Sequence, residues 1–215
     1  MLRSTRAVAA SGGVLMLASV ALTGALSTDA ASASSDGGEV ETEARMNSLN
    51  NSGARGPAEV EVMQRQLDIE IDVRGLAPNL PHAQHIHFGA QARHECPTVA
   101  DDENGDFRLT TTEGAPAYGP IRVSLTTRGD TSPASALAVD RFPTAPMGVE
   151  HYDRETQTQP GVARAIRQGE AVVVIHGVDY NDNDKYDFAS AGKSELDPAL
   201  PAEATDPASC GVLER

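Results

Sequence analysis

Apolar and polar residues alternate in the stretches AEVEV and LDIEIDV, which start at Ala58 and Leu67. A period of two with β-branched residues is typical of half-buried strands. Shorter runs of strand character follow at 82–88, 120–125 and 170–178, and the last contains AVVVIHGV. We therefore expect strands at each of these places.

The connections between these runs are long and rich in Gly, Pro and Asp. Residues 75–81 (GLAPNLP) predict a turn, since two prolines and a glycine oppose a helix. Residues 163–168 are compatible with a single helical turn. Short strands joined by such loops predict an all-β sandwich or barrel with long acidic loops.

The first residues have the features of a secretory signal peptide. Arg3 and Arg6 precede an apolar run of small residues, and Ala31-Ser32-Ala33 fits a cleavage site after Ala33. The alternative is an uncleaved membrane anchor. We expect a signal peptide at 1–33, a polar, disordered linker at 34–57 and the sandwich domain at 58–215. The protein should thus be secreted, with no membrane span in its mature form.

Charge limits the partners. The whole chain has a formal net charge of −14, and the part after Ala33 carries 15 basic and 30 acidic residues, a charge of −15. Such a surface repels nucleic acid and anionic lipid and attracts metal ions, or serves only solubility. No nucleophile-elbow, P-loop or dinucleotide-binding pattern occurs in a fitting context.

The two cysteines, Cys96 and Cys210, are separated by 114 positions. In an oxidising compartment they are expected to form a disulfide, and two free buried thiols are the alternative.

Three of the six histidines lie within six residues, as His82-x-x-His85-x-His87. Residues two apart in a strand face the same side, so His85 and His87 would project together. Neutral imidazoles bind Cu(II) or Zn(II), and His176 would complete a three-nitrogen site if its strand lay alongside. Surface positions or a hydrogen-bond network are the alternative for such a pair.

The stretch DVRGLAPNLPHAQHIHFGA (72–90), followed by Cys96, resembles the copper-site segment of copper/zinc superoxide dismutases. AVVVIHGVD (171–179) and ASCGVL (208–213) are similar to two later blocks of that family. The resemblance covers roughly 67–213 and implies an eight-stranded Greek-key sandwich and a Cys96–Cys210 disulfide. It also implies copper ligands at His85, His87 and His176, and a structural role for His82.

The departures from this family concern its chemistry. Asp102 stands where the family has its bridging histidine, and Pro207 where it has the arginine that guides superoxide. The zinc loop has no counterpart between Cys96 and Leu125, so family-type zinc binding is not expected. His94 and His151 are either replacement ligands or surface histidines. The sequence thus predicts a weakly catalytic or non-catalytic copper-binding module, with a copper-only superoxide dismutase as the alternative.

A second resemblance is to CHRD domains, which carry an element similar to HIHFGA (85–90) and a late strand that ends in histidine. It implies a third possibility, a calcium-stabilised structural or adhesion module.

Two acidic loops have the spacing of calcium ligands. The first departs from an EF-hand loop at Phe107, where a glycine is usual, and the second has Ser190 at the twelfth position. Solvated acidic loops are the alternative. The calcium candidates are Asp102, Asn104, Asp106 and Glu113 in the first loop and Asp179, Asn181, Asn183 and Asp187 in the second.

Overall fold

Eight antiparallel strands form the framework of the computed structural model, which describes residues 38–215; the expected signal peptide lies outside them. The strands are β1 (Val40–Ser48), β2 (Gly56–Met63), β3 (Gln66–Arg74), β4 (Gln84–His87), β5 (Ile121–Ser124), β6 (Val149–Gln157), β7 (Val172–His176) and β8 (Pro207–Val212). The α-helices of this part are α1 (Thr111–Tyr118) and α2 (Pro160–Gln168). Five 3-10 helices lie at 99–101, 133–135, 139–141, 146–148 and 202–204.

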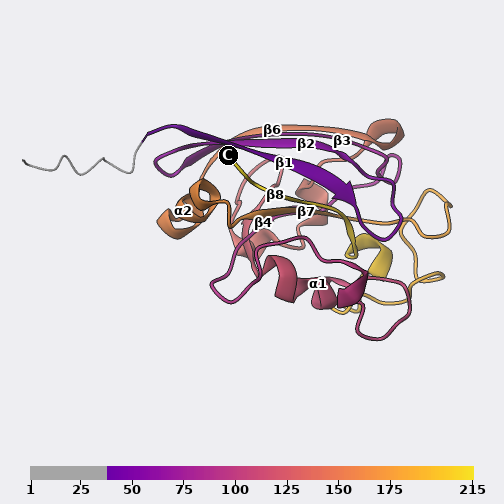
Figure 1. Cartoon of the computed structure of the whole chain (residues 1–215). Helices are drawn as coiled ribbons and strands as arrows, with labels where there is room; N and C mark the ends of the chain where they lie inside the picture. The colour runs from indigo at the N-terminus through magenta and orange to yellow at the C-terminus, as the bar shows by residue number, and fades with distance from the viewer. Residues whose placement is uncertain (1–37) are drawn as a thin grey trace, which may run out of the picture. The chain divides into compact units, whose positions relative to one another are not determined.

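The strands form one sheet in the order β5-β4-β7-β8-β1-β2-β3-β6. β3 pairs with β6 and β7 lies between β4 and β8, so the connections β3–β4, β5–β6 and β6–β7 cross from one half of the sheet to the other, as in a Greek key. The sheet curls into two layers, with β1, β2, β3 and β6 in one and β4, β7 and β8 in the other (Figure 1). The predicted all-β Greek-key sandwich is confirmed.

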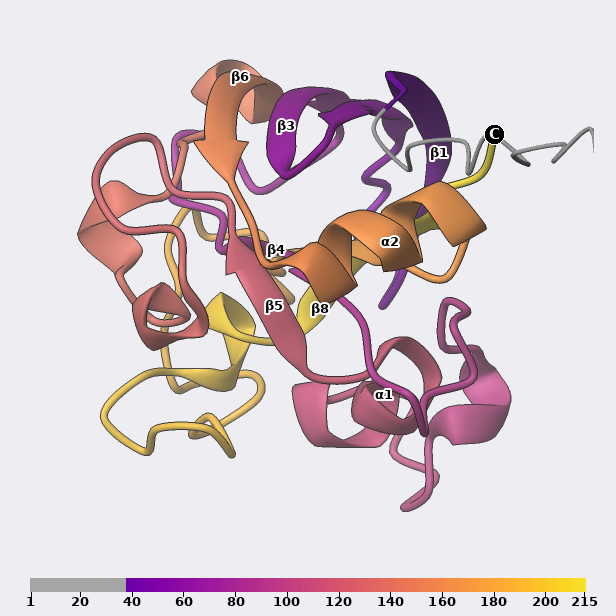
Figure 2. The ribbon, with the colours of Figure 1, turned by 90° about the vertical axis from the view of Figure 1, so that its left-hand side faces the viewer.

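The core fills the space between the two layers. The alternation in β3 places Leu67, Ile69 and Ile71 inward, where they are fully buried, and their polar neighbours outward. The opposite layer contributes Ile86 and Ile175 to the same apolar cluster. Helix α2 closes one end of the curled sheet and adds a buried apolar face to this cluster (Figure 2).

Hydrogen bonds from side chains close the gap between β5 and β6, the two strands at the ends of the sheet order. The Arg154 guanidinium of β6 donates to the hydroxyl of Thr126 (2.7 Å) and to the carbonyl of Gly129 (2.6 Å), both in the loop after β5. The hydroxyls of Thr131 and Thr156 lie 2.9 Å apart across the same gap. The chain thereby protects an edge that would otherwise be open to pairing.

The prediction of a disordered linker at 34–57 is wrong where residues 40–48 form β1 and residues 56–57 begin β2. The inward residues of β1 include Thr42, Ala44 and Met46, all buried. Two of these are small or polar, so the sequence shows little apolar periodicity. The hydroxyl of Thr42 donates to the carbonyl of Val60 (3.0 Å), which allows a polar residue to lie in the core.

The other predicted elements are present with modest changes. The runs at 82–88, 120–125 and 170–178 contain β4, β5 and β7. The expected helical turn at 163–168 is part of the longer α2, which starts at Pro160 and ends at Gly169 in the left-handed conformation that favours glycine. Within residues 38–215, neither α-helix has the length and apolar character needed to cross a bilayer.

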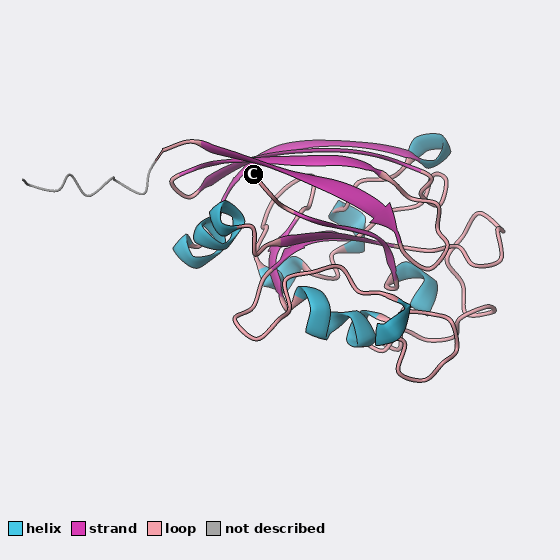
Figure 3. Ribbon diagram, viewed as in Figure 1, coloured by secondary structure: helices cyan, strands magenta, loops and turns pink. Residues whose placement is uncertain are grey.

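The outer faces of the two layers differ. Helix α1 and the long loops cover the outer face of the β4-β7-β8 layer, whereas no described element covers the outer face of the β1-β2-β3-β6 layer (Figure 3). Side chains on the covered face are therefore buried, and those on the uncovered face remain in contact with solvent.

A buried carboxylic acid lies within the sandwich at the start of β6. Glu150 is fully buried, and neither carboxyl oxygen has a hydrogen-bond partner among the described residues. Burial raises its pKa to about 8, while the neighbouring amide of Gln84 lowers it by less. Glu150 is therefore mostly protonated at neutral pH.

A carboxyl whose folded pKa is raised stabilises the fold while it is protonated, and this contribution is lost as the pH rises through that pKa. We expect the free energy of unfolding to fall by about 2 kcal/mol between pH 6.5 and pH 8 because of Glu150. In Glu150→Gln the free energy of unfolding should lack this fall between pH 6.5 and pH 8, as measured by urea unfolding of both proteins at each pH. An equal dependence of the unfolding free energy on pH in the two proteins would contradict a raised pKa for Glu150.

Candidate metal centre

His85 and His87 project from the outer face of β4. Ile86, between them, points into the core, so the two histidines face the opposite side. β7 lies next to β4, and its Ile175 also points into the core, which directs His176 to the outer face. The alternation of two neighbouring strands thus brings three imidazoles together.

The three rings converge on one point. One ring nitrogen from each of His85, His87 and His176 lies within 4.8 Å of the other two. The ring centroids are 5.7 Å apart for His85 and His87 and 5.3 Å apart for His85 and His176. The three histidines expected as ligands form one cluster, which we call the buried triad.

Backbone carbonyls hold each imidazole of the triad through one ring nitrogen. Nδ1 of His87 lies 2.7 Å from the Gly119 carbonyl, and Nδ1 of His176 lies 2.7 Å from the Thr205 carbonyl. Nε2 of His85 lies 3.2 Å from the Ala136 carbonyl. Because a carbonyl only accepts, the nitrogen facing it carries the proton.

The other nitrogen of each ring then has a free lone pair. Nδ1 of His85 and Nε2 of His87 and His176 are buried without a hydrogen-bond partner among the described residues. Burial lowers the pKa of His87 to about 3 and that of His176 to about 4, and it places the pKa of His85 well below its usual value. Three neutral imidazoles directing lone pairs to one point are suited to hold a metal ion.

The loops that supply these carbonyls also enclose the triad. Gly119 follows α1, Ala136 follows the 3-10 turn at 133–135, and Thr205 follows the turn at 202–204. The ring of Tyr118 packs 4.5 Å from that of His87, and the ring of Phe142 packs 5.4 Å from that of His85, between centroids. Each histidine of the triad is at most 3% exposed. The centre is shielded by aromatic rings and loop backbone.

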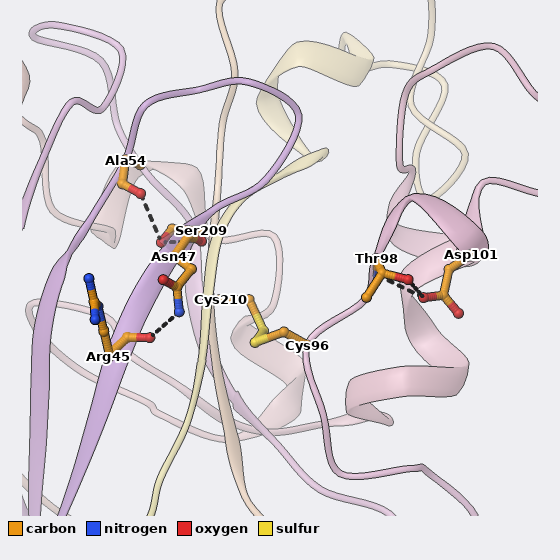
Figure 4. The surroundings of a disulfide bond; sticks show 8 residues. All are labelled: Arg45, Asn47, Ala54, Cys96, Thr98, Asp101, Ser209 and Cys210. Atoms are coloured by element: carbon orange, nitrogen blue, oxygen red, sulfur yellow. Dashed lines mark hydrogen bonds between the residues drawn. A yellow bond between two sulfur atoms is a disulfide. The ribbon is translucent and has the colours of Figure 1, made fainter.

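The predicted disulfide between Cys96 and Cys210 is confirmed, with their Cα atoms 5.7 Å apart. Cys210 lies in β8 and packs with Tyr118 and Val174 on the same outer face as the triad. Cys96 precedes a 3-10 turn that Thr98 and Asp101 cap through reciprocal hydrogen bonds (Figure 4). The disulfide fastens the loop that leads to α1 onto the sheet that carries the histidines.

His82 lies outside the triad and contacts the backbone near it. Its Nδ1 is 2.9 Å from the carbonyl of His176, and its Nε2 is 3.0 Å from the carbonyl of Ala77. Burial lowers its pKa, although both carbonyls act in the opposite direction. This position at the end of β7 fits the structural role that the family resemblance implies.

Other expected positions lie apart from the triad. His94 makes its contact with the Gly89 carbonyl (2.8 Å) and stacks on Phe88. The carboxylate of Asp102 accepts the N–H groups of Gly105 and Phe107 at 2.8 Å in an exposed loop. Asp102 therefore does not lie with the triad as a bridging ligand would.

Pro207 is buried at the start of β8, directly opposite His176 in the ladder. The position of the family's guiding arginine thus carries no charge in this protein, and a longer side chain there would point into packed structure.

Sequence reasoning missed the residues that hold and cover the triad, namely the carbonyls of Gly119, Ala136 and Thr205 and the rings of Tyr118 and Phe142. It also missed Asp206, whose carboxylate is buried beside Thr205. Arg108 (2.8 Å) and the Tyr180 hydroxyl (3.0 Å) donate to that carboxylate, and burial raises its pKa to about 6. A carbonyl leaves no mark on the residue type, so the sequence held no signal for the first three.

The two acidic loops are organised by their own hydrogen bonds. Glu113 accepts the N–H of Thr110 (2.9 Å) as part of the capping box at the start of α1. Asp179 accepts the N–H groups of Asn183 (3.2 Å) and Asp184 (2.7 Å). Within residues 38–215, neither loop brings three His, Cys, Asp or Glu donors within 4.8 Å of one another. Calcium binding stays a prediction.

Neither a family model nor a curated protein sequence matches this chain. Three similar solved structures have low identity and low overlap. A mutant of superoxide dismutase 5 from Candida albicans is 13% identical, with a TM-score of 0.38, over 81% of this chain and 92% of that one. The Cu(II) form of the same enzyme is 14% identical, with a TM-score of 0.38, over 65% and 83%. A double mutant of a superoxide dismutase-like protein from Bacillus subtilis is 15% identical, with a TM-score of 0.37, over 80% and 97%. Overlap of this extent assigns neither a family nor an activity to this chain.

The backbone carbonyls predict a definite tautomer for each ring in the metal-free protein. We expect His87 and His176 to carry the proton on Nδ1 and His85 to carry it on Nε2, since those nitrogens face carbonyls. Two-dimensional NMR correlation of ring nitrogens and carbons with their protons distinguishes the two forms. A proton on Nδ1 of His85, or a doubly protonated, charged ring at any of the three histidines at neutral pH, would contradict the geometry.

Proposed function

We propose that this protein is an exported module that binds one copper ion through His85, His87 and His176 and turns over superoxide slowly or not at all. The observation that carries the proposal is a set of three buried imidazoles, each with one ring nitrogen that lacks a hydrogen-bond partner in the described part of the chain, gathered within 4.8 Å of one another. A buried polar atom without a partner costs about 1–3 kcal/mol, and a bound metal ion offsets that cost at all three atoms together.

The donor set favours copper. Among divalent first-row ions, Cu(II) binds a given nitrogen site most tightly, and imidazole is a suitable ligand for it. Copper, when bound, supplies one-electron chemistry. The protein's own residues hold the rings in place through Gly119, Ala136 and Thr205 and keep water away through Tyr118 and Phe142.

Several features argue against efficient dismutation. Asp102 is on an exposed loop, and buried Pro207 brings no positive charge to the triad. The charge of −15 on the chain after Ala33 repels an anionic substrate. Aromatic rings pack against His85 and His87, and each histidine of the triad is at most 3% exposed, which limits access for a substrate. These features fit binding better than turnover.

Export is part of the proposal. The disulfide between Cys96 and Cys210 is of the kind that persists in oxidising compartments. The sequence of residues 1–33, with its basic start, apolar run and small residues before Ser34, supports the same location.

Copper titration of the purified protein, with a competing chelator, tests the proposal. With the chelator in excess over weaker surface sites, we expect one tightly bound copper ion per chain, and His87→Ala should weaken this binding by at least about 100-fold because it removes a ligand from a set of three. His94→Ala is the matched control, since it removes an imidazole outside the triad and should leave binding unchanged. Equal affinity in the wild type and His87→Ala would refute the proposal.

Two further measurements guard against a misfolded variant and separate the functional alternatives. Electron paramagnetic resonance of the wild-type Cu(II) form should show coupling to three nitrogens; coupling to none would refute the site without any variant. A dismutase assay of the copper form should give little activity. Rapid turnover would replace the binding module by a copper-only superoxide dismutase.

A further inference from the structure

A second convergence of metal-binding groups lies on the other layer of the sandwich. Glu70, Asp72 and His151 each place one donor atom within 4.8 Å of the other two. All three are exposed, and we call them the surface trio. From the surface trio we infer a second metal site, one that binds a divalent ion of the zinc type. The inference is independent of the copper proposal, because the two clusters share no residue and lie on different layers.

Strand pairing brings the three side chains together. Asp72 of β3 lies directly opposite His151 of β6 in the antiparallel ladder. Glu70 precedes Asp72 by two residues, so the pleat directs both carboxylates to the same face. That outer face is uncovered by any described element (Figure 1), which leaves the surface trio accessible to an ion from solution.

The contacts leave donor capacity free. Nδ1 of His151 lies 2.6 Å from a carboxylate oxygen of Asp72, so two of the three donors already face one another, and an ion held by both would replace the proton that they share. The Glu70 carboxylate makes no hydrogen bond or ion pair with any residue of the described part of the chain, whereas Asp72 and His151 pair with one another. Asp153, opposite Glu70 in the ladder, adds another carboxylate at this place. Like charges opposite one another are destabilising, and a divalent cation relieves that repulsion.

High acidity alone does not produce this geometry. A neighbouring row of the same face aligns four carboxylates across four strands. Its members are Glu41, Glu61, Asp68 and Glu155. Within residues 38–215, the only groups of three or more donors within 4.8 Å are the buried triad and the surface trio. The surface trio differs from the row by its convergence and by its imidazole.

The mixture of donors sets the class of ion. An imidazole with two carboxylates suits Zn(II) and similar divalent ions, whereas Ca(II) requires six to eight oxygen ligands. Three protein ligands on an open surface leave coordination positions to water. Because β6 is the last strand of the sheet order, an ion at this place would also clip an edge strand to β3.

Zinc titration by calorimetry tests the inference, with the wild type, His151→Ala and the control Glu61→Gln/Asp68→Asn. The control lowers the charge of the carboxylate row and leaves the surface trio intact. We expect His151→Ala to weaken this zinc site at least tenfold and the control to change it less than about threefold. All substitutions lie at exposed positions, and thermal unfolding without metal confirms that each variant folds.

The outcomes separate the two metal sites. The surface site should persist in His87→Ala, and excess calcium should not displace zinc from it. Zinc should also raise the melting temperature of the wild type more than that of His151→Ala, since an ion that binds only the folded state stabilises it. Identical isotherms for the wild type and His151→Ala, or an equal loss in the carboxylate-row control, would overturn the inference.

Discussion

Three buried imidazole nitrogens have no hydrogen-bond partner among residues 38–215, and the arrangement of the loops around them follows from this. The fold accepts their desolvation because the opposite nitrogen of each ring is tied to a backbone carbonyl. Those carbonyls come from three separate loops, so the loops must be held in place for the rings to converge. The Cys96–Cys210 disulfide fastens the loop that leads to α1. The hydrogen bonds of His82 and Asp206 hold the backbone near His176, at the end of β7.

In both layers of the sandwich, side chains alternate between the core and the outer face, but the outer faces differ in composition. In β4 and β7 the residues that face away from the core are histidine and valine, and loops cover them. In β1, β2, β3 and β6 the residues that face away are mostly charged, and no described element covers them. One layer therefore offers a dry, neutral nitrogen site, and the other offers an exposed, acidic surface that attracts cations.

Much of this architecture could be predicted from single-strand patterns, and the failures have a common cause. β3 and β7 have strong periodicity because their inward residues are large and apolar. β1 and β6 were missed because their inward residues include Thr42, Glu150 and Arg154, which the pattern scores as polar. Thr42 and Arg154 have a polar partner from another strand or loop, namely the carbonyl of Val60 for Thr42 and the loop after β5 for Arg154. Glu150 lies inward as a carboxyl whose pKa burial raises, so that it is mostly uncharged at neutral pH.

Order along one strand and composition are enough to give the spacing of His85 and His87, the side of the strand that they share, and the two cysteines available for a disulfide. The tertiary structure brings His176 to them, since this requires β7 to lie beside β4 in a particular register. It also decided which ring nitrogens are free, because the backbone carbonyls that fix the tautomers belong to residues whose side chains do not reveal them. The convergence of Glu70 and Asp72 with His151 has the same origin, since 79 positions separate the paired Asp72 and His151 and only the ladder between β3 and β6 joins them.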